Sequence, residues 1–429
     1  MTYQETTQFL FSQLPMFERQ GKAGYKSGLD NTLTLDEHFG HPHRNFKTIH
    51  VAGTNGKGSC SHTIAVLLQA NGLKVGLYTS PHLVDFRERI RVNGLCISEQ
   101  YVVDFVEENK PFFTPLHPSF FELTTALAFK YFSEQNVDIA VIEVGLGGRL
   151  DCTNIITPIL SVITNISFDH TQFLGNTLAS IAREKAGIIK RGVPVVVGES
   201  DNETRPVFEQ VASDNDAPLL FADDCSEILS CRHNSTGGME YVTRHYGTLT
   251  GCLTGSYQSK NTNTILAVYR QLQALGVVAD NVQLLQEALE NVVDATGLNG
   301  RWQVVGQRPK VVCDTGHNKA AWQYLGPQLN AVECATMHIV FGMVDDKDIN
   351  SVAEMLPKRA KYYFTQADSH RALKADAVEA ICREKGLVGN SYMSVKEAYT
   401  AAMTNASPSD FVFVGGSSYV VADFLSKCF

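Results

Sequence analysis

Short apolar runs rich in Val and Ile alternate along the chain with longer amphipathic stretches. This alternation is typical of β-α-β units, in which helices join buried parallel strands. The strands expected in the first half are 47–52, 74–79, 138–144, 159–164 and 193–197, and helices are expected to begin near Gly58, Ser98, Ser119 and Thr177. The pattern therefore predicts an α/β fold on a mainly parallel sheet.

The pattern changes twice in the second half. Residues 229–253 alternate in short segments rich in Gly and Thr, which favours an antiparallel hairpin region, and helices are expected near 259–275 and 281–293. A small, polar, Gly-bearing segment at 295–300 then precedes a new alternation of strands and helices. We therefore predict a large N-terminal domain over 1–296 and a smaller, Rossmann-like α/β domain over 297–429.

Composition supports a folded protein of ordinary type. The chain has 429 residues, of which 44% are hydrophobic and 19% charged, and at roughly 150 residues per domain this length fits two or three domains. The net charge of −9 argues against capture of nucleic acid or of an anionic membrane. The start resembles no secretory signal, no apolar run is long enough to span a membrane, and the ten scattered cysteines include no Cys-x-x-Cys pair. We expect a cytoplasmic protein with reduced thiols.

A glycine-rich turn follows the first of these strands and has the sequence Gly53-Thr-Asn-Gly-Lys-Gly-Ser59. Its glycines allow successive N–H groups to converge on phosphate oxygens, while Lys57 and the start of a helix add positive charge. Gly58 interrupts the usual G-x-x-x-x-G-K-[ST] pattern, so a regulatory GTPase or a motor fits less well. The alternative is a simple strand-to-helix turn with a surface lysine. We favour a phosphate loop (P-loop), which makes the large domain a nucleotide-binding one.

Reactive side chains stand at the carboxyl ends of further strands, where ligands gather in parallel sheets. They are Ser80, Glu143, His170 and, in the smaller domain, Asp314. Oxygen ligands beside a phosphate loop suit Mg²⁺. A salt bridge or a capped backbone is the alternative role for Glu143, and a hydrogen-bonded loop imidazole is the alternative for His170.

Many separate strings occur in a recognisable order. They include Gly24-Tyr-Lys-Ser-Gly-Leu29, Thr79-Ser-Pro-His-Leu83, Glu88-Arg-Ile90, Glu143-Val-Gly-Leu-Gly-Gly-Arg-Leu-Asp151, Asp169-His-Thr171, Glu184-Lys-Ala-Gly-Ile-Ile189, Tyr257-Gln258, Gly300-Arg301 and His317-Asn318. Together with the phosphate loop they resemble, over nearly the whole length, the bifunctional bacterial type of the folylpolyglutamate synthase/dihydrofolate synthase family, which is part of the Mur ligase superfamily.

The resemblance implies roles for particular residues. The ATP-binding set would be Thr54, Asn55, Gly56, Lys57, Gly58, Ser59, Asn261, Arg301 and Asp314, with His317 as a further candidate. Ser80 and Glu143 would bind one Mg²⁺ and His170 a second, and Lys185 would be the family's carbamylated lysine. The folate-binding set would be Ser27, Ser119, Phe121, Glu122, Leu150, Asp151 and Cys152. After Asp314 the text Thr-Gly-His-Asn-Lys319 departs from the family's more common Gly-Ala-His-Asn-Pro.

Several of these residues have simpler interpretations. Ser119-x-x-Glu122 is also a helix capping box, and Lys185 alone would be taken as a solvated helix lysine. Asp151 and Arg149 could pair across a turn. A cluster of His38, His41 and His43 matches no standard ligand spacing, so we expect a solvated loop there.

The activity implied by the resemblance is ATP-dependent ligation of L-glutamate. The γ-phosphoryl group would pass to a carboxylate of dihydropteroate or tetrahydrofolate, and glutamate would displace phosphate from the acyl phosphate. We expect a monomer with no nucleic-acid or membrane partner, in which the two domains close during catalysis. The alternatives are another Mur-type amide ligase, such as a peptidoglycan-precursor ligase, and a non-enzymatic nucleotide-binding switch. Chain length of the product, and which of the two activities is present, stay open.

Overall fold

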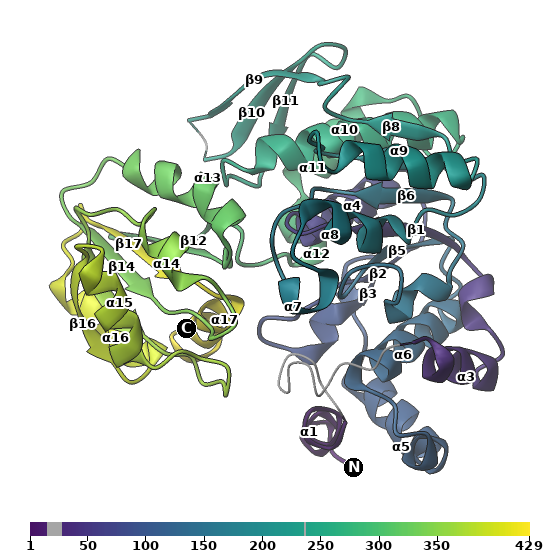
Figure 1. The fold of residues 1–429 in the computed structure, drawn as a ribbon, viewed down its shortest axis with the longest axis horizontal. Coiled ribbons are helices and arrows are strands. Elements are labelled where there is room, and N and C mark those ends of the chain that lie inside the picture. Colours follow the sequence, from purple (N-terminus) through teal and green to yellow (C-terminus); the bar gives the residue numbers. More distant parts are fainter. Residues whose placement is uncertain (15–27, 236) are drawn as a thin grey trace. The chain divides into compact units, whose positions relative to one another are not determined.

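The computed structural model describes residues 1–14, 28–235 and 237–429 of the chain (Figure 1). They form two compact units, the first made of residues 1–252 and 259–297 and the second of residues 253–258 and 298–429. The chain therefore enters the second unit briefly before α10 (Gln258–Ala274) and returns to it for good after residue 297. The domain division predicted after residue 296 stays a prediction.

The first unit is built on an eight-stranded sheet in the order β4-β3-β2-β5-β1-β6-β7-β8. Its strands are β1 (Lys47–Ala52), β2 (Val75–Tyr78), β3 (Ile90–Val92), β4 (Leu95–Cys96), β5 (Ile139–Glu143), β6 (Leu160–Ile163), β7 (Val195–Val197) and β8 (Leu219–Phe221). Strands β2, β5, β1, β6, β7 and β8 pair in parallel, while β3 and β4 are antiparallel. The prediction of an α/β fold with a mainly parallel sheet is confirmed.

Helices cover both faces of this sheet because its strands are apolar on both sides. They are α1 (Tyr3–Gln13), α3 (Asp30–His38), α4 (Lys57–Ala70), α5 (Glu99–Leu116), α6 (Phe120–Glu134), α7 (Thr171–Leu174), α8 (Leu178–Ala186), α9 (Arg205–Asp214), α10, α11 (Val282–Glu290) and α12 (Val292–Thr296), with 3₁₀ turns η2 (Pro42–Arg44), η3 (Phe86–Arg89) and η4 (Cys152–Ile155). Ile49 and Val51 of β1 face α4, α10 and α11, whereas Tyr78 and Ile142 face α5 and α6. The two faces of the sheet are thus packed against separate apolar clusters.

The Gly- and Thr-rich region forms a separate antiparallel sheet. It consists of β9 (Ile228–His233), β10 (Met239–Thr243) and β11 (Thr248–Gly251) in the order β11-β10-β9. The expected hairpin region is therefore a three-stranded meander. Its buried residues are Met239, Tyr241 and Thr243 of β10 and Leu249 and Gly251 of β11.

The second unit has a six-stranded sheet in the order β12-β13-β17-β14-β15-β16, with β12 antiparallel to the others. Its strands are β12 (Gln303–Gln307), β13 (Lys310–Asp314), β14 (Met337–Phe341), β15 (Lys361–Thr365), β16 (Val388–Tyr392) and β17 (Phe411–Gly415), and its helices are α13 (Lys319–Asn330), α14 (Ile349–Ala353), α15 (Ala375–Glu384), α16 (Val395–Asn405) and α17 (Ser418–Lys427). Its core includes Trp302, Trp322 and Phe413. The predicted second α/β sheet is confirmed.

A helix that crosses a lipid bilayer needs about 20 mostly apolar residues. Within residues 1–14, 28–235 and 237–429, none combines the length and the apolar character of a membrane-spanning helix.

Candidate active site

The glycine-rich turn between β1 and α4 is closely packed. Gly56, the residue before α4, has φ 82°, and a Cβ atom there would lie 2.3 Å from Oδ1 of Asn261. Gly53 has φ 147°, and a Cβ atom there would lie 1.8 Å from Oγ1 of Thr164. Only glycine fits either place without displacing a neighbour. The structure thus brings Asn261 beside the predicted phosphate loop.

Two lysines meet at this loop. Nζ of Lys57 donates to the carbonyl oxygens of Gly53 at 3.1 Å and Thr54 at 3.0 Å. Nζ of Lys185, from α8, donates to the same Gly53 carbonyl at 2.8 Å. Among the described residues neither lysine forms a salt bridge, although the carboxylates of Asp169 and Asp151 partly offset the positive charge of Lys185.

Lys185 is not the solvated helix lysine of the simpler interpretation, because only 5% of it is exposed. Burial, with a smaller contribution from the positive charge of Lys57, lowers the pKa of Lys185 to about 7. Both effects act in the same direction, since each makes the ammonium form less favourable. At physiological pH the amine is therefore neutral in a substantial fraction of molecules, and a neutral amine is nucleophilic.

Glu143 and Ser80 come together at the ends of β5 and β2. The backbone N–H of Ser80 donates to Oε2 of Glu143 at 3.1 Å, and Glu143 is buried. His170, after β6, has φ 49° and precedes α7, and its backbone N–H donates to the carboxylate of Asp169 at 2.8 Å. No three His, Cys, Asp or Glu side chains in the described part of the chain gather as a metal site. A carboxylate and a hydroxyl still suit Mg²⁺, which takes much of its coordination shell from phosphates and water.

Ser119 and Glu122 form the capping box of α6. The Ser119 side chain accepts from the Glu122 N–H, and Oε2 of Glu122 accepts from the Ser119 N–H at 2.6 Å and from Nδ2 of Asn31 at 3.3 Å. The capping-box interpretation is confirmed. A role for the same residues in folate binding stays a prediction.

Asp151 holds the loop after β5 in shape. It is buried and accepts from the N–H groups of Leu146 at 2.8 Å and Thr153 at 3.0 Å. Burial raises the pKa of its carboxyl, against those hydrogen bonds. The suggested pairing with Arg149 is wrong, because Arg149 binds Glu184 at 2.9 Å instead.

The remaining candidates for folate binding lie around this loop. The Phe121 ring leaves no space for a Cβ atom at Gly145, the nearest ring atom being 2.4 Å away. Leu150 and Cys152 flank Asp151 and are half-buried, and burial raises the pKa of the Cys152 thiol. Ser27 lies outside the described residues.

In the second unit, Asp314 ends β13 and is buried. Its Oδ2 accepts from the hydroxyl of Tyr257 at 2.6 Å and from the N–H of Trp302 at 2.7 Å, and its Oδ1 accepts from the N–H of Gly316 at 2.8 Å. Arg301 donates to the Thr315 hydroxyl. These contacts organise Asp314 and Arg301 within the unit.

His317 also lies in the loop after β13. Its Nδ1 is 3.0 Å from the carbonyl oxygen of Thr315.

Sequence reasoning missed the residues that hold the phosphate loop from the side of β6. Asn165 and Thr164 contact the backbone of Asn55. Their position in the sequence could have indicated this role. Both residues directly follow β6, which pairs with β1, the strand that leads into the glycine turn.

The histidine cluster was also misjudged. Nδ1 of His41 and Nδ1 of His43 each lie 2.6 Å from an oxygen of the buried Asp36, so the cluster fastens a loop to α3 instead of being merely solvated.

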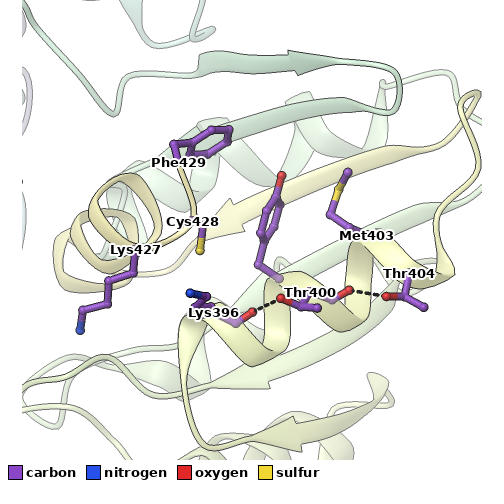
Figure 2. Close-up of a pocket in the computed structure, with 8 residues that line it drawn as sticks. Lys396, Thr400, Met403, Thr404, Lys427, Cys428 and Phe429 are labelled. Carbon is purple, nitrogen blue, oxygen red and sulfur yellow. Dashed lines mark hydrogen bonds between the residues drawn. The ribbon is translucent and has the colours of Figure 1, made fainter.

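A groove of about 550 Å³ lies in the second unit, beside α16 and the end of α17 (Figure 2). Its lining residues are Lys396, Tyr399, Thr400, Met403, Thr404, Lys427, Cys428 and Phe429. None of the predicted site residues is among them. The groove is therefore separate from the candidate site.

Comparison with known proteins adds two family matches. Residues 51–269 match the Mur ligase middle domain, and residues 300–418 match the Mur ligase, glutamate ligase domain. The first match contains the glycine-rich turn, Glu143, Lys185 and Asn261, and the second contains Arg301 and Asp314.

Individual relatives are similar to this chain over nearly its whole length. The dihydrofolate synthase/folylpolyglutamate synthase of Bacillus subtilis is 32% identical over 95% of this chain and 96% of its own. A probable bifunctional folylpolyglutamate synthase/dihydropteroate synthase of Haloferax volcanii is 34% identical over 99% of this chain, which spans about half (50%) of that relative's length. A solved structure of Escherichia coli FolC in complex with DHPP and ADP superposes with a TM-score of 0.83 at 30% identity, covering 99% of this chain and 97% of that one.

Proposed function

Because the chain belongs to the folylpolyglutamate synthase/dihydrofolate synthase family of Mur ligases, we propose that it uses ATP to join L-glutamate to a folate-type acid. The acid is dihydropteroate, the γ-carboxylate of tetrahydrofolate, or both. One observation carries the proposal: Nζ of Lys57 and Nζ of Lys185 converge on one carbonyl of a glycine turn, where Lys57 would bind the phosphates of a nucleotide.

The chemistry follows from the reactants. A carboxylate is a poor electrophile, and its oxygen is a poor leaving group. Transfer of the γ-phosphoryl group to a carboxylate oxygen breaks the bond to ADP and forms an acyl phosphate. The α-amine of glutamate then attacks the carbonyl carbon, a proton leaves the nitrogen, and inorganic phosphate departs as the amide forms. No nucleophilic side chain is needed, so the protein contributes positioning and charge neutralisation.

Different residues are proposed to bind the phosphates, the metal ions and the rest of the nucleotide. Lys57 would neutralise the transferred phosphoryl group, and the first N–H groups of α4 would bind phosphate oxygens. Ser80 and Glu143 would hold one Mg²⁺ and His170 a second, and bound Mg²⁺ would supply further neutralisation of the phosphates. Asn261, Arg301 and Asp314 are proposed as nucleotide contacts, with His317 as a further candidate.

Lys185 is proposed to carry a carbamate. Its neutral amine would attack the carbon of CO₂, forming an N–C bond and releasing one proton. The pKa of about 7 supports this reaction, because an ordinary lysine is almost entirely protonated at neutral pH. The new carboxylate would also remove the unfavourable proximity of two ammonium groups at the Gly53 carbonyl.

The acid substrate is proposed to lie against the segments 119–122 and 150–152. Ser27 is proposed as a further contact of this substrate. The capping box and the Asp151 hydrogen bonds would give this surface a fixed shape. We further propose a monomeric cytoplasmic enzyme, which the ten free cysteines and the net charge of −9 support.

A single assay tests the proposal. Purified protein is incubated with ATP, Mg²⁺ and labelled glutamate, and separately offered dihydropteroate, tetrahydrofolate or a nucleotide-linked muramyl peptide. We expect label in a folate product and phosphate release that depends on both folate and glutamate. Transfer to the muramyl peptide alone would favour the peptidoglycan branch, and phosphate release that depends on neither acceptor nor glutamate would favour a nucleotide switch.

A further inference from the structure

We propose that Asn165 is a positioning residue that sets the shape of the phosphate loop by pairing with the backbone of Asn55. This inference rests on the proposed function only in taking the glycine turn as the nucleotide site. Asn165 lies just beyond β6, outside the set of residues expected to bind nucleotide, metal or folate.

The side-chain amide of Asn165 pairs with both polar groups of one residue in the loop. Its Oδ1 accepts from the N–H of Asn55 at 3.0 Å, and its Nδ2 donates to the carbonyl oxygen of Asn55 at 3.1 Å. The backbone carbonyl of Asn165 accepts from the N–H of Thr54 at 2.9 Å. The ladder between β1 and β6 ends at Ala52 and Ile163. Asn165 thus extends the pairing into a loop that has left the sheet.

This pairing decides which N–H groups remain for phosphate. Those of Thr54 and Asn55 already donate to Asn165. The first bond within α4 runs from the N–H of Cys60 to the carbonyl of Gly56 at 2.9 Å, and the N–H groups of the residues before it in the helix have no acceptor within the helix. The phosphates would therefore meet the backbone N–H groups of Lys57 and Gly58 at the start of α4, while Thr54 and Asn55 serve to shape the loop.

Neighbouring groups hold the Asn165 amide in this orientation. The carboxylate of Glu199 lies near the Asn165 side chain, which opposes the rise in the Glu199 pKa that burial causes, and a carboxylate favours the Nδ2 side of the amide. Glu199 is in turn 3.6 Å from Nζ of Lys260. An amide nitrogen has two hydrogens, so Nδ2 can serve the Asn55 carbonyl and Glu199 together.

Two further contacts tie the same segment to the loop. Oγ1 of Thr164 donates to the Asn55 carbonyl at 2.6 Å, and the N–H of Ser167 donates to Oγ1 of Thr54 at 3.0 Å. The segment then continues to His170, a proposed metal ligand. Residues 164–167 thereby connect the phosphate loop to the metal side of the proposed site.

The test measures nucleotide binding separately from catalysis. Calorimetry of the full chain with Mg²⁺ and a nonhydrolysable ATP analogue compares the wild type with N165A and N165D. N165A loses both side-chain bonds to Asn55, and N165D places an oxygen against the Asn55 carbonyl. We expect affinity about tenfold lower for N165A and at least as low for N165D, with a KM for the folate substrate close to that of the wild type.

The matched control is N263A. Asn263 also bridges two backbone groups of the first unit, donating to the Ala222 carbonyl at 3.0 Å and accepting from the Glu227 N–H at 2.8 Å. It should lower thermal stability as N165A does, yet leave the nucleotide affinity unchanged.

A second pair keeps the test valid if N165A fails to fold. T164V removes one bond to the Asn55 carbonyl at nearly constant volume and should weaken nucleotide binding severalfold, whereas T164S retains the hydroxyl and should bind like the wild type. Affinities of N165A or T164V within twofold of the wild type would overturn the inference. Tight nucleotide binding by a wild type that transfers no glutamate would instead overturn the proposed function and leave this inference standing.

Discussion

The two candidate binding regions of the first unit differ in how their buried charged side chains are hydrogen-bonded. At the phosphate loop, Lys57 and Lys185 donate to backbone carbonyls and, within the described residues, form no salt bridge, so that Lys185 is only partly offset by the carboxylates of Asp169 and Asp151. In the proposed folate segment, Glu122 and Asp151 accept from N–H groups of their own surroundings. A buried charge is costly unless it is compensated. The comparison teaches that a buried charged group without a salt bridge indicates a binding site for a charged ligand. A buried charged group whose hydrogen bonds are all made within the fold indicates a structural role.

The largest effect is expected when a positive charge is removed from the phosphate loop. We expect Lys57→Ala to lower kcat/KM for glutamate ligation by at least about a hundredfold, because the transferred phosphoryl group loses its cation. Lys74→Ala is the control, since Lys74 also donates to a backbone carbonyl, that of Gln135. Equal losses in both variants would mean that the loop lysine has only a structural role.

The second prediction concerns the charge on Lys185. Its pKa of about 7 in the folded protein lies below the ordinary lysine value of 10.5. Between these pH values the unfolded chain therefore binds more protons, and the free energy of unfolding rises with pH. The slope is at most about 1.4 kcal/mol per pH unit, and Lys185→Met should abolish this contribution. Urea unfolding of both proteins in CO₂-free buffer from pH 6 to pH 10 measures it. Parallel curves would show that the lysine is not held in its neutral form.

The third prediction sharpens the role of close packing in the loop. Gly56→Ala should destabilise the protein by about 1–3 kcal/mol and weaken nucleotide binding, because its Cβ would lie 2.3 Å from Oδ1 of Asn261 at φ 82°. The double variant with Asn261→Ala should recover the part of the stability that is due to the clash. Thermal unfolding measures both, and no recovery would assign the whole cost to the backbone angle.

The smallest effect is expected in the proposed folate segment, at the capping box of α6. Ser119→Ala should cost about 1 kcal/mol through the lost helix cap, and Ser119→Thr should retain most of the stability because its hydroxyl can cap. Denaturant unfolding and the KM for dihydropteroate are measured together. A KM that rises tenfold in the alanine variant while stability changes little would make Ser119 a substrate contact and weaken the comparison.

Local patterns were sufficient to predict the strand into the loop, the start of α4 and the helix beginning after Ser119, because periodicity, glycines and caps act over a few residues. The partners of Arg149 and of the histidines were not predictable, because Glu184 and Asp36 reach them through tertiary packing. The burial of Lys185 has the same origin, since an amphipathic helix alone does not say how deeply one lysine will lie. The family resemblance identified the residue, but its low pKa comes mainly from this burial, with a smaller contribution from the neighbouring Lys57.

The two units are interleaved along the chain, and this has a consequence for proteolysis. A single cut near residue 297 would leave residues 253–258 covalently attached to the N-terminal fragment, although they belong to the second unit. These residues include Tyr257, which binds Asp314, and Ser256, whose N–H donates to Gln328 at 2.7 Å. A nicked protein should therefore elute as one particle under native conditions and separate into fragments only in denaturant. Genes split at this point would yield halves that complement each other poorly unless both were synthesised together.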